Sequence, residues 1–302
     1  MHIWQDESSD EIAANNGCCG FSAVEDARKV AAILGIPHYV MDFRKEFKES
    51  VIDYFSSEYL RGRTPNPCIA CNRYVKWGAL LKRAEGLGAG YIATGHYAGV
   101  ERLENGRYAV KKSTSQKDQT YALYNLTQEQ LKATLMPLGG YEKSRVRELA
   151  REAGLPVSQK KDSQEICFIP DHDHASFIER EYGGKAGDAG NFVTADGKIL
   201  GHHKGIVHYT IGQRRGLNLA VGRHIYVTGI RPETNEVVVG FGDEVFSDSL
   251  TVNGVNFMSV SDEMFPVGSE KRLWGKIRYR HEGEWCIVKR TSEDKLQAVF
   301  EK

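Results

Sequence analysis

Apolar residues recur at helical spacing through the first half of the chain, and short apolar runs lie between these segments. Phe47, Val51, Ile52 and Phe55 fall on one face of a predicted helix. A buried strand is predicted at 91–94, where an apolar run ends before a glycine. Because helices and strands alternate, the pattern predicts a parallel sheet with helices on both faces. Ligands of such sheets bind at the carboxyl ends of strands, so the residues after 91–94 become candidates for a binding site.

Turn and cap residues place the remaining elements of this half. Ser22 and Glu25 have the spacing of a capping box, and a helix predicted at 143–153 ends at Gly154 and Pro156. The other predicted elements are the end of a strand at 1–4, a strand at 38–43, a helix through Trp77, Leu80 and Leu81, a hairpin turn at Asn105-Gly106, and a helix that begins at Thr127.

From Gly183 onward the chain is rich in glycine and β-branched residues, in short segments separated by turns. This pattern predicts antiparallel strands that form a barrel or a sandwich. The chain ends at 299–302 without a turn or a cap, so we expect the last strands of this β domain to lie beyond the given sequence. The predicted strands are 192–200 with a turn at Asp196-Gly197, 225–239, 250–257, 272–280 and 285–290.

Composition indicates a soluble, globular protein, with 41% hydrophobic and 26% charged residues in 302. Forty basic residues balance forty acidic ones, so net charge gives no sign of a polyanionic partner, and a nucleic-acid surface would need local charge asymmetry. Six cysteines are too few for a disulfide scaffold. No secretory leader and no run of membrane-spanning length is present, so we expect a reducing cytoplasm and no membrane association.

Two cysteines lie three residues apart in Thr64-Pro65-Asn66-Pro67-Cys68-Ile69-Ala70-Cys71-Asn72. A helix is predicted to begin at these cysteines, where backbone N–H groups and the helix dipole lower the pKa of a thiol. We expect the proline-stiffened loop to expose both thiols, which argues against an inert buried pair. A redox pair, a single nucleophile and part of a metal site remain open. A zinc site is disfavoured because it needs a second close pair of ligands.

Cys167 follows Asp162, Ser163 and Glu165, an acidic surrounding that raises the pKa of a thiol. Taken alone, it is typical of a structural cysteine. It becomes a candidate for catalysis if the fold brings it to Cys71 over an RNA base. The alternative is an iron–sulfur cluster held by Cys167 and both cysteines of the proline loop.

Several further motifs are candidates for binding, and each also has an ordinary structural interpretation. His96 follows a strand end and would lie near a nucleotide, although such a histidine is usually structural. The segment 117–119 is a polar loop that could contact RNA. The glycine-bracketed loop 210–217 holds a glutamine and two arginines, which suits contact with phosphates or base edges. Arg278-Tyr279-Arg280 in a strand offers surface for stacking, whereas Asp171-His172-Asp173-His174 is best explained as a solvated loop.

These motifs together resemble the tRNA-specific 2-thiouridylases, which place sulfur on the wobble uridine of tRNA. The resemblance runs over nearly all of the 302 residues. The segments that carry it are Gly62 to Pro67 with Cys71-Asn72, Ala93-Thr94-Gly95-His96-Tyr97, Lys117-Asp118-Gln119-Thr120-Tyr121, Asp162-Ser163 with Ile166-Cys167-Phe168-Ile169, Gly201-His202 with Lys204-Gly205, Tyr209 to Leu217, and Arg278-Tyr279-Arg280.

The resemblance implies an ATP-dependent reaction with Mg²⁺ as counterion, in which ATP adenylates the C2 oxygen of the uridine. A persulfide on Cys167, loaded by a sulfur-relay protein or a cysteine desulfurase, delivers the sulfur. Cys71 then forms a disulfide with Cys167 and releases the product, which is thiolate exchange chemistry. The further implied contacts are Asn66, Pro67 and Cys68 with the flipped base, Met1 and Gly95 with ATP, and His96, Lys117, Asp118, Gln119, Arg278 and Tyr279 with tRNA.

The resemblance also implies the architecture. We expect a nucleotide-binding α/β domain of the PP-loop ATPase type at 1–170, a small central tRNA-contacting domain at 171–245, and a C-terminal antiparallel β-barrel at 246–302. The first strand and the Ser-Gly-Gly-Val-Asp-Ser phosphate loop of the family are absent from the given sequence, so we expect a truncated chain. Many relatives have aspartate where this chain has Cys68. A non-catalytic tRNA-binding remnant and an ATP-pyrophosphatase-type enzyme acting on a small molecule are the competing hypotheses.

Overall fold

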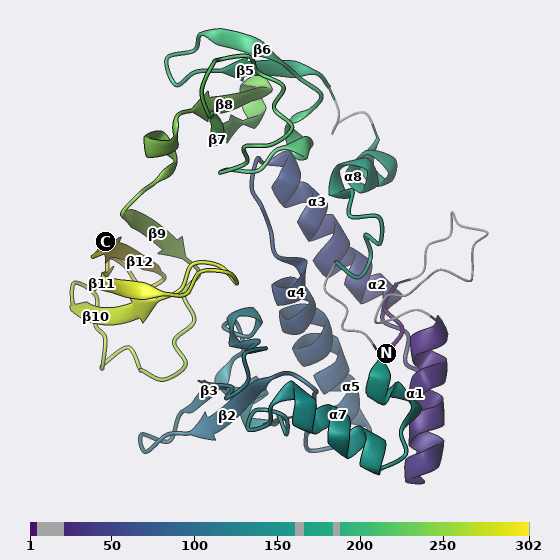
Figure 1. Cartoon of the computed structure of the whole chain (residues 1–302). Coiled ribbons are helices and arrows are strands. Elements are labelled where there is room, and N and C mark those ends of the chain that lie inside the picture. Colours follow the sequence, from purple (N-terminus) through teal and green to yellow (C-terminus); the bar gives the residue numbers. More distant parts are fainter. Residues whose placement is uncertain (5–20, 161–165, 184–187, 302) are drawn as a thin grey trace. The chain divides into compact units, whose positions relative to one another are not determined.

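The computed structural model describes residues 1–4, 21–160, 166–183 and 188–301 (Figure 1). Contacts between its elements divide the chain into two compact units. The first unit joins Met1–Ala70 to Lys161–Phe246, and the second unit joins Cys71–Lys160 to Ser247–Lys302. Each unit therefore combines two stretches that are far apart in the sequence. Among the described residues, no helix is long and apolar enough to cross a membrane.

Helices form the first half of the first unit, and their apolar face is the predicted one. Phe47, Val51, Ile52 and Phe55 are each 0% exposed. The predicted strand at 38–43 is reduced to a single parallel bridge between His2 and Asp42. The helices are α1 (Phe21–Leu34), then α2 (Arg44–Phe47), η1 (Lys48–Ile52) and α3 (Asp53–Leu60) without a gap, then α4 (Pro67–Ala70), and, beside α3 in Figure 1, α8 (His174–Tyr182).

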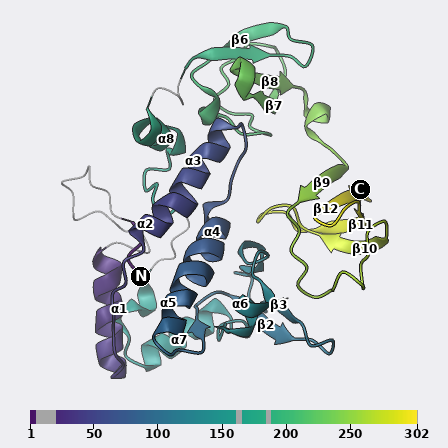
Figure 2. The same cartoon turned by 180° about the vertical axis from the view of Figure 1, so that it is seen from behind.

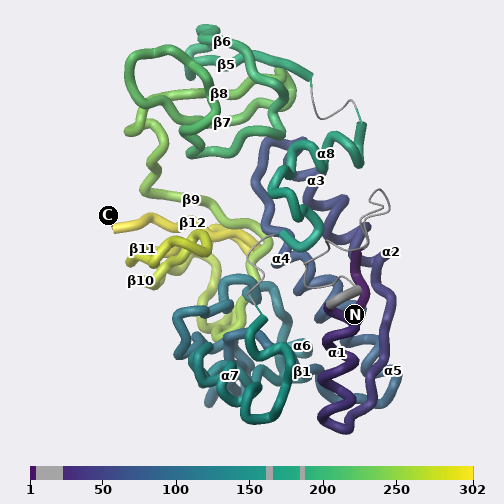
Figure 3. Tube along the Cα trace, turned by 45° about the vertical axis from the view of Figure 1, so that its right-hand side comes forward, coloured from purple at the N-terminus to yellow at the C-terminus, as the bar shows by residue number. Residues whose placement is uncertain are grey.

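A small sheet completes the first unit. Its strand order is β6-β5-β8-β7, as Figure 3 shows; β5 pairs in parallel with β8, and the outer pairs are antiparallel. The predicted turn at Asp196-Gly197 is confirmed, with Gly197 at φ 90°. The bounds are β5 (Gly190–Val193), β6 (Ile199–His203), β7 (Tyr226–Arg231) and β8 (Glu236–Gly240), with the short 3₁₀ turns η5 (Ile206–His208), η6 (Pro232–Thr234) and η7 (Gly242–Val245).

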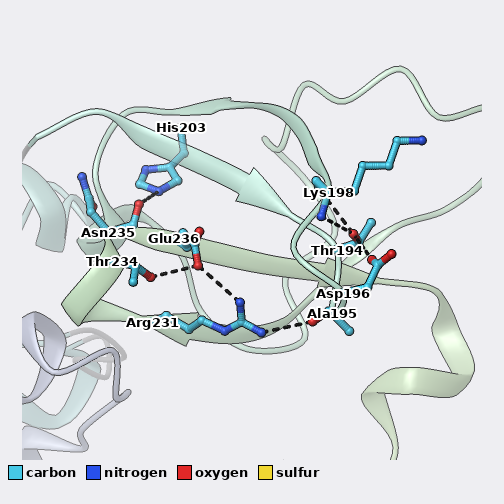
Figure 4. Close-up of polar contacts among 9 residues, drawn as sticks. All are labelled: Thr194, Ala195, Asp196, Lys198, His203, Arg231, Thr234, Asn235 and Glu236. Atoms are coloured by element: carbon cyan, nitrogen blue, oxygen red, sulfur yellow. Dashed lines mark hydrogen bonds and ion pairs between the residues drawn. The ribbon is translucent and has the colours of Figure 1, made fainter.

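Side-chain contacts hold the ends of this sheet together (Figure 4). Arg231 forms an ion pair with Glu236 at 3.3 Å and donates to the carbonyl of Ala195, also at 3.3 Å. The Nε2 atom of His203 lies 3.1 Å from the carbonyl oxygen of Asn235. These contacts fasten the β5–β6 turn and the β7–β8 turn to the sheet and hold both turns in place.

The second unit is built around a core from its helices and one hairpin. Trp77, Leu81, Leu123 and Leu131 are among its buried residues. Asn105-Gly106 forms the predicted hairpin turn, which Figure 2 shows from behind. The elements are η2 (Cys71–Leu80), α5 (Leu81–Gly86), β1 (Ile92–Ala93) parallel to β4 (Thr134–Leu135), β2 (Ala98–Arg102), β3 (Tyr108–Lys112), η3 (Thr120–Ala122), α6 (Gln128–Lys132), α7 (Lys143–Glu152) and η4 (Pro156–Gln159).

Four antiparallel strands form the end of the chain, in the order β10-β11-β12-β9. Cys286, Val288 and Arg290 alternate with exposed residues on β11, as expected for a sheet with one covered face. The predicted strand at 272–280 is wrong beyond Gly275, where the strand ends. The bounds are β9 (Ser249–Asn253), β10 (Glu270–Gly275), β11 (Glu284–Arg290) and β12 (Lys295–Phe300).

Candidate active site and RNA-contacting residues

Local chemistry positions the start of the cysteine helix. The Oδ1 atom of Asn66 accepts a hydrogen bond of 3.0 Å from the backbone N–H of Cys68, in the first turn of the helix. Pro67 occupies the first helical position, where its missing N–H costs nothing. The predicted helix start is therefore confirmed. Pro67 is buried, and Cys68 is an exposed residue of the first turn.

Cys71 differs from its expected exposure. It is 8% exposed, so the proposal that the proline loop exposes both thiols is wrong for this one. The loop ends at Pro67, and Cys71 lies one turn later on η2, whose buried face also includes Asn72, Val75 and Trp77. The wide π-helical winding of η2 is uncommon, and such winding frequently occurs at functional sites.

Asn72 connects this helix to η3, which directly follows the polar loop at 117–119. It is 2% exposed, and its Nδ2 atom donates to the carbonyl of Ala122 at 3.0 Å. Its Oδ1 atom accepts from Nζ of Lys76, also at 3.0 Å. Our sequence interpretation did not select Lys76. The signal that could have found it is the spacing of four residues, which places Asn72 and Lys76 on one helix face.

His96 lies in the second unit beside the same helix. Its ring is 5.5 Å from the ring of Trp77, and its Nδ1 atom is 2.9 Å from Oγ1 of Thr94. The pKa of His96 is lowered to about 4, first because burial disfavours the charged imidazolium and second because Lys76 is positive. His96 is therefore neutral at neutral pH, and it acts as a hydrogen-bonding and stacking group rather than as a cation for phosphate.

The three residues at 117–119 divide into two structural roles. Gln119 is locked to Tyr97, because Tyr97 N–H donates to Gln119 Oε1 at 2.9 Å and Gln119 N–H donates to the Tyr97 carbonyl at 2.9 Å. Asp118 accepts from the backbone N–H of Ser113 at 2.8 Å and holds the turn. Lys117 is exposed. Only Lys117 therefore presents a charged side chain to solvent without a contact that shapes the loop.

Gly95 and the pair Arg278-Tyr279 are open to solvent in the second unit. A side-chain atom placed on Gly95 would meet only Leu138 Cδ1, at 3.8 Å, so a ligand can approach this backbone closely. Arg278 and Tyr279 are exposed, but they lie in the turn after β10 and not in a strand as predicted. Tyr121 donates to the carbonyl of Ile277 at 3.3 Å. This bond brings the 117–121 loop next to Arg278.

Cys167 is held in the first unit by its neighbours. It lies half-buried in a turn closed by a 3.0 Å bond from Ile169 N–H to the Ile166 carbonyl. Phe168 and Ile169 are each 2% exposed. The Phe168 ring lies in an aromatic cluster, with centroids 6.4 Å from Trp4, 5.7 Å from Phe47, 5.4 Å from Phe55 and 5.3 Å from Phe177. The predicted acidic neighbours Asp162, Ser163 and Glu165 lie outside the described residues.

Met1, which the resemblance predicts to contact ATP, also lies in the first unit. Met1 is half-buried and precedes the bridge residue His2, whose N–H donates to the Met41 carbonyl at 2.8 Å. In the part of the chain that the structure describes, no group of three or more His, Cys, Asp or Glu side chains is arranged to hold a metal ion. Asp173 caps α8 through Ser176 N–H at 3.1 Å.

The glycine-bracketed loop at 210–217 uses its glutamine internally. Gln213 accepts from the Thr210 N–H and donates to the Arg215 carbonyl, each at 3.0 Å. The Gln213 side chain, which was expected to contact phosphates or base edges, thus stabilises the conformation of its own loop. Arg214 and Arg215 are both exposed.

Comparisons with known proteins show which family the chain resembles. The tRNA methyl transferase HUP domain matches residues 1–171, and the tRNA methyl transferase PRC-barrel domain matches residues 175–241. The tRNA-specific 2-thiouridylase MnmA of Lachnoclostridium phytofermentans is 57% identical over 302 residues, which are 100% of this chain and 83% of the relative. The protein of the same name from Clostridium acetobutylicum is 53% identical over 287 residues (95% and 79%), and that from Clostridioides difficile is 50% identical over 303 residues (100% and 82%).

Proposed function

The chain belongs to the tRNA-specific 2-thiouridylase family, and from this premise we propose how its residues divide the reaction. The protein is a tRNA sulfurtransferase of mixed α/β fold that thiolates tRNA, and its family uses ATP. The position of the sulfur is C2 of the wobble uridine. The observation that carries the proposal is the placement of Cys167: a half-buried thiol on a turn that two buried neighbours fix in place.

Cys167 carries the transferred sulfur as a persulfide. ATP first adenylates the C2 oxygen of the uridine, which turns that oxygen into a leaving group. The outer sulfur of the persulfide bonds to C2, and the C2–oxygen bond breaks as AMP leaves. A persulfide must survive until the base is activated, and a partly buried thiol limits its loss to other thiols. Anchoring by Phe168 and Ile169 supports this role because a fixed turn holds the sulfur in one position.

Cys71 completes the transfer as the second thiol. Its thiolate attacks the sulfur of Cys167, the sulfur–sulfur bond to the product breaks, and 2-thiouridine leaves with a disulfide between the two cysteines. A thiol reductant then restores both thiols. Burial of Cys71 at 8% exposure supports a role late in the cycle, because small-molecule thiols and oxidants reach a buried sulfur poorly.

Two residues are proposed for ATP and three for the target base. Met1 and Gly95 contact ATP, and the open space at the Gly95 backbone supports close approach by a nucleotide. Mg²⁺ accompanies the ATP phosphates as their counterion. Asn66, Pro67 and Cys68 lie against the flipped base. In this chain Asn66 also shapes the helix start, so it has a structural role as well as a binding role.

The remaining contacts are to tRNA outside the target base. His96 offers a neutral ring beside Trp77, Arg278 and Tyr279 offer an exposed guanidinium and ring, and Lys117 offers an exposed ammonium. Asp118 and Gln119 support these contacts by fixing their loop. A sulfur-relay protein or a cysteine desulfurase loads Cys167, and the protein works in the cytoplasm. The central tRNA-contacting part is 171–245, between an α/β part at 1–170 and a β part at 246–302.

The test measures 2-thiouridine in tRNA after incubation of the purified protein with ATP and a persulfide donor. We expect Cys71→Ser and Cys167→Ser each to lower the product by at least about 100-fold, because a hydroxyl cannot replace the transferred or attacking sulfur. Cys286→Ser is the control, since that thiol is buried in the β sheet and bonded to the Leu273 carbonyl at 3.4 Å. Nucleoside mass spectrometry separates replacement of oxygen by sulfur from addition of a methyl group.

Three outcomes would contradict the proposal. Unchanged thiolation in the Cys167→Ser variant would remove the persulfide role. A methylated nucleoside in place of a thiolated one would change the reaction itself. Binding of tRNA without any ATP-dependent product would favour the competing hypothesis of a tRNA-binding protein.

A further inference from the structure

Acidic residues are missing from a long stretch of the first unit. Between Asp196 and Glu233 the sequence contains no aspartate or glutamate, although the chain as a whole has forty. The same stretch contains six basic residues, Lys198, Lys204, Arg214, Arg215, Arg223 and Arg231. A neutral protein thus has one strongly basic segment, which is the local charge asymmetry that a polyanion requires.

A pocket of about 370 Å³ opens within this basic segment. Its lining includes Arg214, Arg223, His224 and the segment from Gly216 to Ala220. Leu217 and Ile225 are buried at 4% and 6% exposure and fasten the two sides of this loop to the domain. The loop also begins on the sheet, because Gly212 N–H donates to the Val227 carbonyl at 2.8 Å and Val227 N–H donates to Gln213 at 3.0 Å. We name this cavity the arginine pocket.

The two arginines of the arginine pocket keep hydrogen-bond donors available. The guanidinium of Arg223 lies 3.1 Å from the ring centroid of Phe241, and stacking on a ring uses the face of the guanidinium and leaves its N–H edge open. Among the described residues, none forms an ion pair with Arg214 or Arg223. An arginine that lacks a carboxylate partner and faces a cavity is suited to bidentate contact with phosphate oxygens.

We propose that the arginine pocket binds backbone phosphates of the tRNA substrate, away from the reacting base. This inference rests on the proposed function only in taking the RNA to be tRNA. Lys198 and Lys204 are exposed on the same sheet domain outside the pocket, and in Figure 4 the Lys198 ammonium points away from the contacts that hold the sheet. Cations that continue beyond the pocket fit an extended chain of phosphates better than a single free nucleotide. The pocket adds affinity and register, and it leaves the chemical step unchanged.

The test compares the salt dependence of tRNA binding in four single variants. Arg214→Ala and Arg223→Ala remove pocket cations, Arg215→Ala removes a neighbouring charge outside the lining, and Arg28→Ala removes an exposed arginine on α1. We expect each pocket variant to weaken binding several-fold and to reduce the slope of log K against log salt by about one. Arg28→Ala should match the parent protein. In steady-state thiolation, KM for tRNA should rise while kcat stays constant.

The outcomes separate the pocket from simpler explanations. If Arg215→Ala lowers the slope as much as Arg214→Ala, general surface charge is sufficient and the pocket assignment is overturned. If AMP or pyrophosphate displaces tRNA from the parent protein but not from Arg214→Ala, the pocket holds a free nucleotide and the RNA assignment is wrong. Arg214 is exposed on its loop, so its removal does not threaten folding. If the parent protein thiolates tRNA and the pocket variants bind tRNA as the parent does, this inference alone is refuted. If the parent protein does not thiolate tRNA, the proposed function is refuted.

Discussion

At the scale of single residues, His96 shows how burial determines chemical role. It follows a strand end, and the sequence predicted a position near a nucleotide. Burial and the nearby ammonium of Lys76 lower its pKa to about 4. The ring next to Trp77 is therefore uncharged in the working range of most cells. Any contact of His96 with RNA must be made through stacking or through a neutral hydrogen bond.

The lowered pKa of His96 predicts a pH-dependent stability. In the unfolded chain a histidine titrates near 6.5, so between about pH 6.5 and 4 the unfolded state binds more protons. The stability contribution is complete above pH 6.5 and is lost as the pH falls toward 4, by about 3 kcal/mol at most. Urea unfolding from pH 7 to 4.5 should show this loss in the parent protein and a smaller loss in His96→Gln.

An NMR titration of the His96 ring checks the cause. The pKa should rise in Lys76→Met, since that change removes the second cause and leaves the burial. A measured pKa near 6.5 in the parent protein would contradict the expected neutral ring. Equal pH dependence in the parent protein and in His96→Gln would assign the stability loss to other groups.

At the scale of elements, Gly62 determines where the cysteine loop starts. It follows α3 with φ at 70°, and its missing side chain faces β7. A Cβ atom there would lie 2.9 Å from Ile230 Cγ2 and 3.0 Å from Ile230 Cβ. Ile230 is β-branched and part of a paired strand, so it cannot move aside easily. The loop before Asn66 is therefore set by contact with a strand far along the sequence.

Gly62→Ala should destabilise the protein more than Gly35→Ala. Both glycines have positive φ, at 70° and 65°, so both substitutions cost about 1–2 kcal/mol in backbone strain. Only Gly62 adds a steric clash, which costs about 1–3 kcal/mol more. At Gly35 nothing lies within 4 Å of the added atom, which makes it the matched control. Equal melting temperatures for the two variants would show that the strand does not restrict this loop.

At the scale of the whole molecule, the chain returns to the second unit for its last strands. It leaves one compact unit for the other after residues 70, 160 and 246. Arg107 on the hairpin donates to the carbonyls of Met258 at 2.8 Å and Phe257 at 2.6 Å. Asn256 donates to the carbonyl of Leu126 at 2.9 Å. The segment before β10 is therefore joined to the hairpin by bonds from a few side chains.

Removal of Arg107 should loosen both parts of the second unit together. Each bond from a charged donor contributes about 1.5–3 kcal/mol, and Arg107→Ala leaves two carbonyls without this donor. Hydrogen exchange followed by mass spectrometry should then show faster exchange in β2–β3 and also in β9–β12. Arg102→Ala, an exposed arginine of the same hairpin, is the control. Faster exchange confined to the hairpin would contradict this coupling.

Features that depend on neighbours in the sequence could be predicted from the sequence. The buried face of Phe47 and Val51, the start of a helix at the cysteine loop, the helix that begins after Thr127 and the Asn105-Gly106 turn were all predicted. Each follows from hydrogen bonds or packing within a few residues, where spacing alone specifies the geometry. The family was also visible at this level, because its motifs lie in short contiguous segments.

Only the tertiary structure decided the features that depend on distant partners. The burial of Cys71, the turn position of Arg278 and the internal use of Gln213 all differ from their expected roles. Periodicity cannot say which face of a helix other segments cover, nor where a strand loses its partner. The arginine pocket likewise arises because Leu217 and Ile225 fold a basic segment against its own domain. The sequence determined which chemical groups exist, and long-range packing decided which of them solvent and RNA can reach, because exposure is a property of the surroundings and not of the residue.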